Sequence, residues 1–132
     1  MNNNNITNFL IVGLGGCIGS ILRYGLGLSV QNVSINFPYG TFIANLTACL
    51  VIGIISELSE KMGIVSPEIR LLLMTGFCGG LSTMSSLIYE LSKMIQDREY
   101  LISAMYLMLS IIFCLIFYYI GTGMIKLIFR QG

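Results

Sequence analysis

The sequence predicts an all-α membrane protein with four transmembrane helices. Hydrophobic residues make up 55% of the 132 positions and charged residues only 10%, which is more apolar surface than a small soluble domain can bury. The apolar residues gather in four stretches, each close to the ~20 residues that a helix needs to cross the hydrocarbon core. Breaks rich in charged or turn-forming residues separate these stretches. We therefore expect one transmembrane domain over residues 1–132, with spans at about 6–28, 37–56, 69–91 and 101–127.

The composition argues against several classes of function. The net charge of +1 is not concentrated in a basic block, so nothing favours nucleic acid as a partner. The chain has no histidine and no nucleophile paired with a base, and we therefore do not expect an enzyme. The asparagine-rich start lacks the features of a signal peptide, so the first stretch should remain as a span of a multi-pass cell-membrane protein. The cysteines fall one in each stretch and are interpreted as packing residues: Cys17, Cys49, Cys78 and Cys114.

The first span carries small residues along one helix ridge. Gly15, Gly19, Arg23 and Gly27 recur at every fourth residue, a spacing that places them on one face and permits close helix contact in lipid. A buried arginine in a membrane is costly without carbonyl or carboxylate partners. Arg23 should therefore point into the protein or reach an interface.

The second span contains one amide side chain, Asn45, about two turns inside the membrane. An asparagine in this position commonly bonds to a neighbouring helix. Its NH₂ group is also a neutral donor for an anion, and a neutral donor can release a small anion that a fixed cation would hold too tightly. Both interpretations remain open from the sequence.

The third span contains a segment that is a poor helix. Two adjacent glycines, Gly79 and Gly80, precede a run of hydroxyl residues that compete for backbone hydrogen bonds. Non-helical backbone at membrane depth is tolerated only where protein buries it or water reaches it. We therefore predict a third helix broken in mid-membrane, with an ion site or pore wall at the break. The alternative is a continuous helix with a glycine packing notch.

The fourth span carries a polar stripe on an otherwise apolar helix. Its residues recur at every fourth position and should line something wet, unless their hydroxyls bond to carbonyls of their own helix. The stripe consists of Tyr106, Ser110, Cys114, Tyr118 and Thr122.

The cations at the two ends of the spans are nearly balanced, so the positive-inside rule does not fix the orientation. A weak bias can arise by accident in a small protein. It is also what a subunit inserted in both orientations would need. The cations near the end that carries the termini are Lys61, Arg70, Lys126 and Arg130, and those near the other end are Lys93 and Arg98.

Four segments, one in each span, together resemble the Fluc, or CrcB, family of fluoride channels. They are GGCIGSILRYGLG at 15–27, GTFIANLTACLVIG at 40–53, GFCGGLSTMSSLIYE at 76–90 and YLMLS at 106–110. The resemblance implies a channel for passive fluoride efflux that lowers fluoride toxicity. It also implies an antiparallel, dual-topology dimer with two narrow pores. A structural sodium ion would be held between the subunits, where the broken third helices cross.

The resemblance also implies roles for individual residues. The main-chain carbonyls of Gly79 and Ser82 match the sodium ligands, and Arg23 matches the arginine of the first helix. Thr83, Ser85 and Ser86 occupy the hydroxyl-rich segment, with Thr83 in a structural role. The residues that match the fluoride pore are Asn45, Met84, Ser85, Ser86, Leu87, Tyr106 and Ser110.

Two pore positions depart from the family pattern. Met84 and Leu87 stand where phenylalanine is usual, and a ring edge carries the positive part of an aromatic quadrupole that these side chains lack. One alternative is therefore a subunit that pairs with a paralogue to form a heteromeric fluoride channel. Another is a small four-helix proton-coupled exporter, for which Glu90 is the candidate carboxylate inside a span.

Overall fold

The computed structural model describes residues 3–33, 37–61 and 63–130, and the regular elements in these ranges are all helical. The first and second spans are α1 (Asn3–Val30) and α2 (Tyr39–Ser56), which continues into the π-helical segment η1 (Glu57–Lys61). The third consists of α3 (Pro67–Arg70), η2 (Leu71–Cys78), α4 (Gly79–Leu81) and α5 (Met84–Gln96), and the fourth is α6 (Tyr100–Phe129). Within the described ranges, four helical runs are long and apolar enough to cross a membrane, as predicted: Asn5–Val30, Tyr39–Lys61, Pro67–Gln96 and Tyr100–Phe129.

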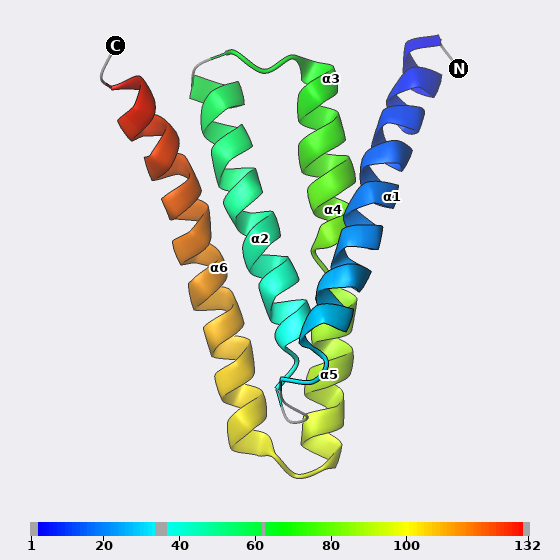
Figure 1. Cartoon of the computed structure of the whole chain (residues 1–132), viewed down its shortest axis with the longest axis vertical. Helices are drawn as coiled ribbons and strands as arrows, with labels where there is room; N and C mark the ends of the chain where they lie inside the picture. Colours follow the sequence, from blue (N-terminus) through cyan, green and yellow to red (C-terminus); the bar gives the residue numbers. More distant parts are fainter. Residues whose placement is uncertain (1–2, 34–36, 62, 131–132) are drawn as a thin grey trace.

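The four runs stand side by side along the long axis of the molecule (Figure 1). The start of α1 and the end of α6 lie at the same end, which an even number of spans requires. The turn between α5 and α6 lies at the opposite end. The helix α1 packs on η2, α4 and α2, and α2 packs on α6, so the first half of the third span, η2 and α4, lies beside both α1 and α2.

Glycines bring the helix backbones into direct contact. A Cβ atom at Gly15 would overlap the carbonyl oxygen of Leu72, and one at Gly19 would overlap that of Phe77. These contacts confirm the predicted packing ridge on α1 at Gly15 and Gly19, whereas a Cβ atom at Gly27 would have open space within the described chain. A similar approach joins α2 to α6, where a Cβ atom at Gly53 would overlap the carbonyl oxygen of Tyr118. Small residues allow such contacts because helices in lipid associate largely through close van der Waals packing.

The buried side chains of the described residues pack in two small clusters rather than in one large core. Ala44, Ala48, Cys78 and Leu81 form the first between α2 and the third span. The second lies between α5 and α6 and comprises Leu87, Leu91, Met94 and Tyr106.

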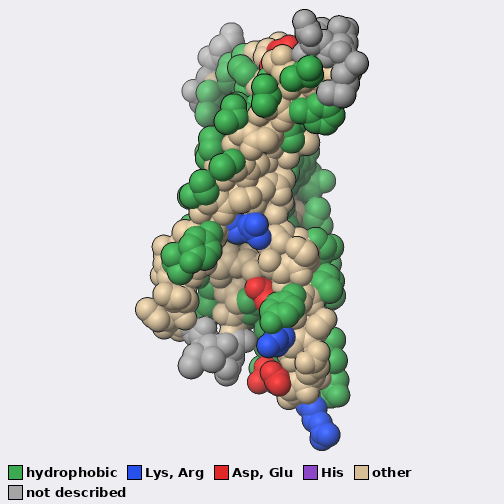
Figure 2. Space-filling view, turned by 90° about the vertical axis from the view of Figure 1, so that its right-hand side faces the viewer, with side chains coloured by type: hydrophobic (Ala, Val, Ile, Leu, Met, Phe, Trp, Pro, Cys, Tyr) green, Lys and Arg blue, Asp and Glu red, His purple; other side chains and the backbone are tan. Residues whose placement is uncertain are grey.

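Most of the remaining apolar surface faces outward. In the most hydrophobic window of each helix, only 11% of the residues of α1 and 17% of those of α6 are buried. Figure 2 shows hydrophobic side chains along the whole face that carries α1, with most charged side chains in its middle and lower parts. Such a surface suits lipid or another helix.

Candidate ion site at the junction of α4 and α5

The backbone leaves the helix for two residues between α4 and α5. Ser82 has φ −77° and ψ 154°, and Thr83 has φ −152° and ψ 112°, so both are extended. They follow the two glycines and begin the hydroxyl-rich run that the sequence marks as a poor helix. An interruption of this kind removes backbone hydrogen bonds that must be replaced in an apolar environment.

Asn45 replaces one of these bonds. In a continuous helix the Thr83 N–H would donate to the Gly79 carbonyl. Here it donates to Asn45 Oδ1 at 2.7 Å, while Asn45 Nδ2 donates to the Thr83 carbonyl at 3.5 Å. The interpretation of Asn45 as a helix-to-helix contact is therefore confirmed. The Nδ2 group carries two protons, so one remains for another acceptor.

Arg23 satisfies a second backbone group at the junction. The Gly80 carbonyl would accept from the Met84 N–H in a continuous helix, but it accepts from Arg23 Nε at 3.1 Å. This contact confirms that Arg23 points into the protein and finds a carbonyl partner. It also ties α1 to the end of α4, directly beyond the glycine contacts.

The hydroxyl groups after the junction form their own network. Thr83 Oγ1 accepts from the Ser86 N–H at 3.1 Å and so caps the start of α5. The same oxygen lies 3.1 Å from the hydroxyls of Ser85 and Ser86. Ser82 turns back and donates from Oγ to the Cys78 carbonyl at 2.8 Å. These short polar side chains stabilise the return to helical geometry.

A carboxylate on α5 joins the site to α2 and α6. Tyr106, which is fully buried, donates from its hydroxyl to Glu90 Oε2 at 2.8 Å, and Thr41 Oγ1 donates to Glu90 Oε1. The sequence did not predict the role of Thr41 or the hydrogen bond between Tyr106 and Glu90. One signal was available, because a carboxylate inside a span needs donors and Thr41 lies one turn from Asn45 on α2.

Ser110 is the buried polar side chain whose Oγ has no hydrogen-bond partner among the described residues. Its residue is only 4% exposed. It lies one turn beyond Tyr106 on α6, in the predicted polar stripe. Buried hydroxyls are normally paired, so an unpaired one is a candidate for contact with an ion or water.

The two departures from the family pattern lie in different environments. Met84 is 69% exposed, whereas Leu87 is 5% exposed and packs with Leu91, Met94 and Tyr106. Leu87 therefore belongs to the side-chain core of the chain, and Met84 lies on its surface. Their spacing of three residues did not reveal this difference.

A recess leads from the α5–α6 end toward the junction. A hollow of about 630 Å³ lies between the end of α1, the start of α2 and α5, with Thr41, Glu90 and Lys93 in its wall. A second hollow of about 230 Å³ shares Thr41 with the first and reaches Arg23 and Thr83. Together they give polar groups at the junction a connection to the surface. No group of three His, Cys, Asp or Glu residues suited to a metal occurs in the described ranges.

Within the described ranges, four apolar helical runs and a junction whose polar groups bond between helices define a small multi-pass membrane protein. The family described as CrcB-like protein, Camphor Resistance (CrcB), matches residues 10–122. The chain therefore belongs to this family, as its four motifs predict.

Curated relatives cover nearly the whole chain. It is 43% identical over 118 residues to "Fluoride-specific ion channel FluC" of Chlorobium phaeobacteroides strain BS1, covering 89% of this chain and 92% of the relative. The corresponding protein of Chlorobaculum tepidum is 42% identical over 120 residues, covering 91% and 95%. "Fluoride-specific ion channel FluC 1" of Methanosarcina acetivorans is 35% identical over 112 residues, covering 85% and 86%. These names describe ion channels and not enzymes.

Proposed function

We propose that this chain is a subunit of a fluoride-specific ion channel that lets fluoride leave the cell passively and so lowers its toxicity. The observation that carries the proposal is the similarity, over nearly the full chain, to proteins named as fluoride-specific channels. The geometry of the junction supports it, because the hydroxyl residues Thr41, Thr83 and Ser86 line a recess that reaches the surface.

Fluoride is small and strongly hydrated, so a pore must replace its water with donors without holding it permanently. Asn45 can offer the Nδ2 proton that Thr83 does not use, and Ser110 can offer an unpaired hydroxyl proton. Tyr106 donates its one hydroxyl proton to Glu90. Its direct contact with fluoride therefore requires this bond to open.

We also propose that the third helix is broken in mid-membrane and that two copies assemble as an antiparallel dimer. Ser82 and Thr83 lie near the middle of the Pro67–Gln96 run, which favours a break at membrane depth. Apolar side chains exposed along α1 and α6 provide surface for a second copy. Nearly balanced cations at the two ends favour insertion in both orientations.

The residues Gly79 and Ser82 fit a sodium ion held through main-chain oxygens. The Gly79 carbonyl has lost its helical donor because the Thr83 N–H bonds to Asn45. Hard monovalent cations prefer such carbonyl ligands. Gly79 is on the surface of the subunit, so ligands from a second copy would complete the site.

Replacing Gly79 by Val tests the sodium ion and the dimer together. A Cβ atom there would meet no described atom of this chain within 4 Å, so the fold of the subunit should survive. We expect loss of the dimer and of fluoride flux, measured by light scattering and fluoride release. Gly13→Val is the matched control, because a Cβ atom at Gly13 also has open space within the described chain. Unchanged assembly and flux in Gly79→Val would refute the sodium proposal.

Growth of fluoride-sensitive cells tests the proposed function against the alternatives. Expression of this chain alone should restore growth in fluoride and leave sensitivity to cationic dyes unchanged. Protection against dyes instead would indicate an exporter that uses Glu90. Protection that requires a co-expressed paralogue would indicate a heteromeric channel.

A further inference from the structure

A cluster of charged side chains lies at the end of the molecule opposite the recess, where α2 and η1 meet the last turns of α6. Glu57 Oε2 lies 3.7 Å from Lys61 Nζ and 3.8 Å from Lys126 Nζ. The Glu57 side chain is 6% exposed, whereas those of Lys61 and Lys126 are 63% and 53% exposed. We refer to these three residues as the terminal charge cluster.

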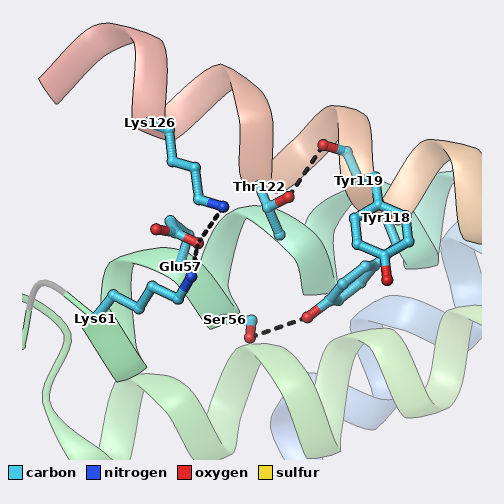
Figure 3. Close-up of polar contacts among 7 residues, drawn as sticks. All are labelled: Ser56, Glu57, Lys61, Tyr118, Tyr119, Thr122 and Lys126. Atoms are coloured by element: carbon cyan, nitrogen blue, oxygen red, sulfur yellow. Dashed lines mark hydrogen bonds and ion pairs between the residues drawn. The ribbon is translucent and has the colours of Figure 1, made fainter. Parts of the chain in front are cut away.

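The cluster lies at the end of the polar stripe on α6. Lys126 follows Thr122 by four residues and so continues the stripe that includes Ser110. Between them, the Tyr118 hydroxyl lies 3.3 Å from the Ser56 hydroxyl of α2. Figure 3 shows Tyr118 and Lys126 pointing from α6 toward Ser56 and Glu57. One helix face therefore joins a buried, unpaired hydroxyl to an exposed ammonium group.

The buried carboxylate fixes where the two cations lie. A carboxylate with so little exposure is costly unless cations pair with it. Both ammonium groups contact the same oxygen, and each keeps more than half of its side chain in solvent. The formal charges of Glu57, Lys61 and Lys126 sum to +1. The result is a small excess of positive charge, held at the end of the stripe.

We propose that the terminal charge cluster is an electrostatic collar that draws fluoride toward the stripe on α6. This inference rests on the proposed channel function. A charge next to a low-dielectric wall raises the local concentration of counter-ions and so the rate of ion capture. Because Glu57 already neutralises part of the lysine charge, the collar concentrates the anion without binding it tightly.

Ionic strength provides the test, because the screening length is about 30 Å at ~0.01 M salt and about 3 Å at ~1 M. The measurement is the initial rate of fluoride release from liposomes at low fluoride concentration. Glu57→Gln raises the charge of the collar from +1 to +2 and should increase the rate at low ionic strength. Removing the whole cluster, with Glu57→Gln, Lys61→Gln and Lys126→Gln together, should lower it by roughly threefold. Both differences should vanish at high ionic strength.

Arg70→Gln is the matched control. Arg70 lies at the same end, and its Nη2 is 3.8 Å from Glu60 Oε1, but it is not on the stripe of α6. The change removes the same net charge as removal of the whole cluster but at a different place, so at low ionic strength it should lower the rate clearly less than the cluster variant does. Size-exclusion chromatography of every variant establishes that the protein is folded.

The direction in which Glu57→Gln changes the rate of fluoride release distinguishes the collar from a purely structural clamp between α2 and α6. The collar predicts an increase at low ionic strength. A clamp predicts that Glu57→Gln lowers the rate equally at both ionic strengths, and this result would overturn the inference while the wild type still releases fluoride. An effect of Arg70→Gln equal to that of the cluster variants would also overturn it. Absence of fluoride release by the wild type would refute the proposed function itself, and the collar with it.

Discussion

The two halves of the third span are held in different ways. The half that comprises η2 and α4 packs on α1 through backbone contacts, with Gly15 and Gly19 against the carbonyl oxygens of Leu72 and Phe77. The other half, α5, packs through side chains, and Leu87 lies in a core cluster with Tyr106 of α6.

A straight helix cannot easily serve both partners, because glycine contact needs backbones close together and a side-chain core needs them further apart. Ser82 and Thr83 lie where the change occurs. The lost helical bonds are replaced by Asn45 and Arg23, and Arg23 also lines the recess together with Thr83. Residues that stabilise the junction thus also belong to the proposed ion site.

The glycine-packed half should show the largest effect of a single substitution. Gly19→Val places a side chain against the Phe77 carbonyl, and backbone cannot move aside as a side-chain end can. We expect no folded protein by size-exclusion chromatography. Gly13→Val, on the same helix but with open space around it in the described chain, should behave like the wild type. Normal folding of Gly19→Val would show that the contact of α1 with η2 is loose.

At the junction, Asn45→Asp should remove fluoride flux from the protein that still folds and assembles. The carboxylate can still accept the Thr83 N–H, but it replaces the Nδ2 donor with a negative charge that repels an anion. We expect at least a tenfold loss of fluoride release, which corresponds to a permeation barrier raised by about 1.4 kcal/mol or more. Asn45→Ala differs because it leaves the Thr83 N–H without its acceptor, and it should destabilise the protein by about 1–3 kcal/mol. Wild-type flux in Asn45→Asp would make Asn45 a packing residue only.

On α5, the half of the third span that packs through side chains, phenylalanine should affect stability differently at position 84 and at position 87. Leu87→Phe adds volume to a packed cluster and should cost about 1–3 kcal/mol of stability, whereas Met84→Phe on the surface should cost little. If Met84 faces the pore in the dimer, Met84→Phe should also raise fluoride flux, by up to about tenfold. Thermal unfolding and fluoride release measure the two effects. Equal stability of both variants would contradict the contrast in packing.

The smallest effect on the fold should come from Ser110→Ala. Its hydroxyl has no partner in the described chain, so removing it should leave stability unchanged or slightly higher. Fluoride flux should nevertheless fall severalfold if the hydroxyl contacts the ion. Reduced stability without a change in flux would place Ser110 in the packing of α6 and not on the path.

Sequence spacing predicted the faces of single helices well. The ridge of Gly15 and Gly19 and the inward direction of Arg23 follow from one periodicity and from the cost of a buried charge. Composition alone predicted four spans because it depends on no contact between helices.

Contacts between distant helices could not be predicted in the same way. The link of Glu90 to Tyr106 and Thr41, and that of Glu57 to Lys126, depend on how helices rotate against each other. The resemblance also assigned both Met84 and Leu87 to the pore, although Leu87 packs in the cluster with Tyr106 of α6 and Met84 is exposed. For Asn45 the sequence offered two roles, and the structure assigns a partner but leaves one proton free for the other role.

Anion release from liposomes that contain only this purified chain tests the central claim most directly. A potassium gradient with valinomycin supplies the driving force, and fluoride and chloride are measured in matched vesicles. We predict that fluoride is released and chloride retained, because the neutral donors of Asn45 and Ser110 suit a small, hard anion. Equal release of both ions, or retention of both by correctly assembled protein, would contradict the claim that this chain forms a fluoride-specific channel.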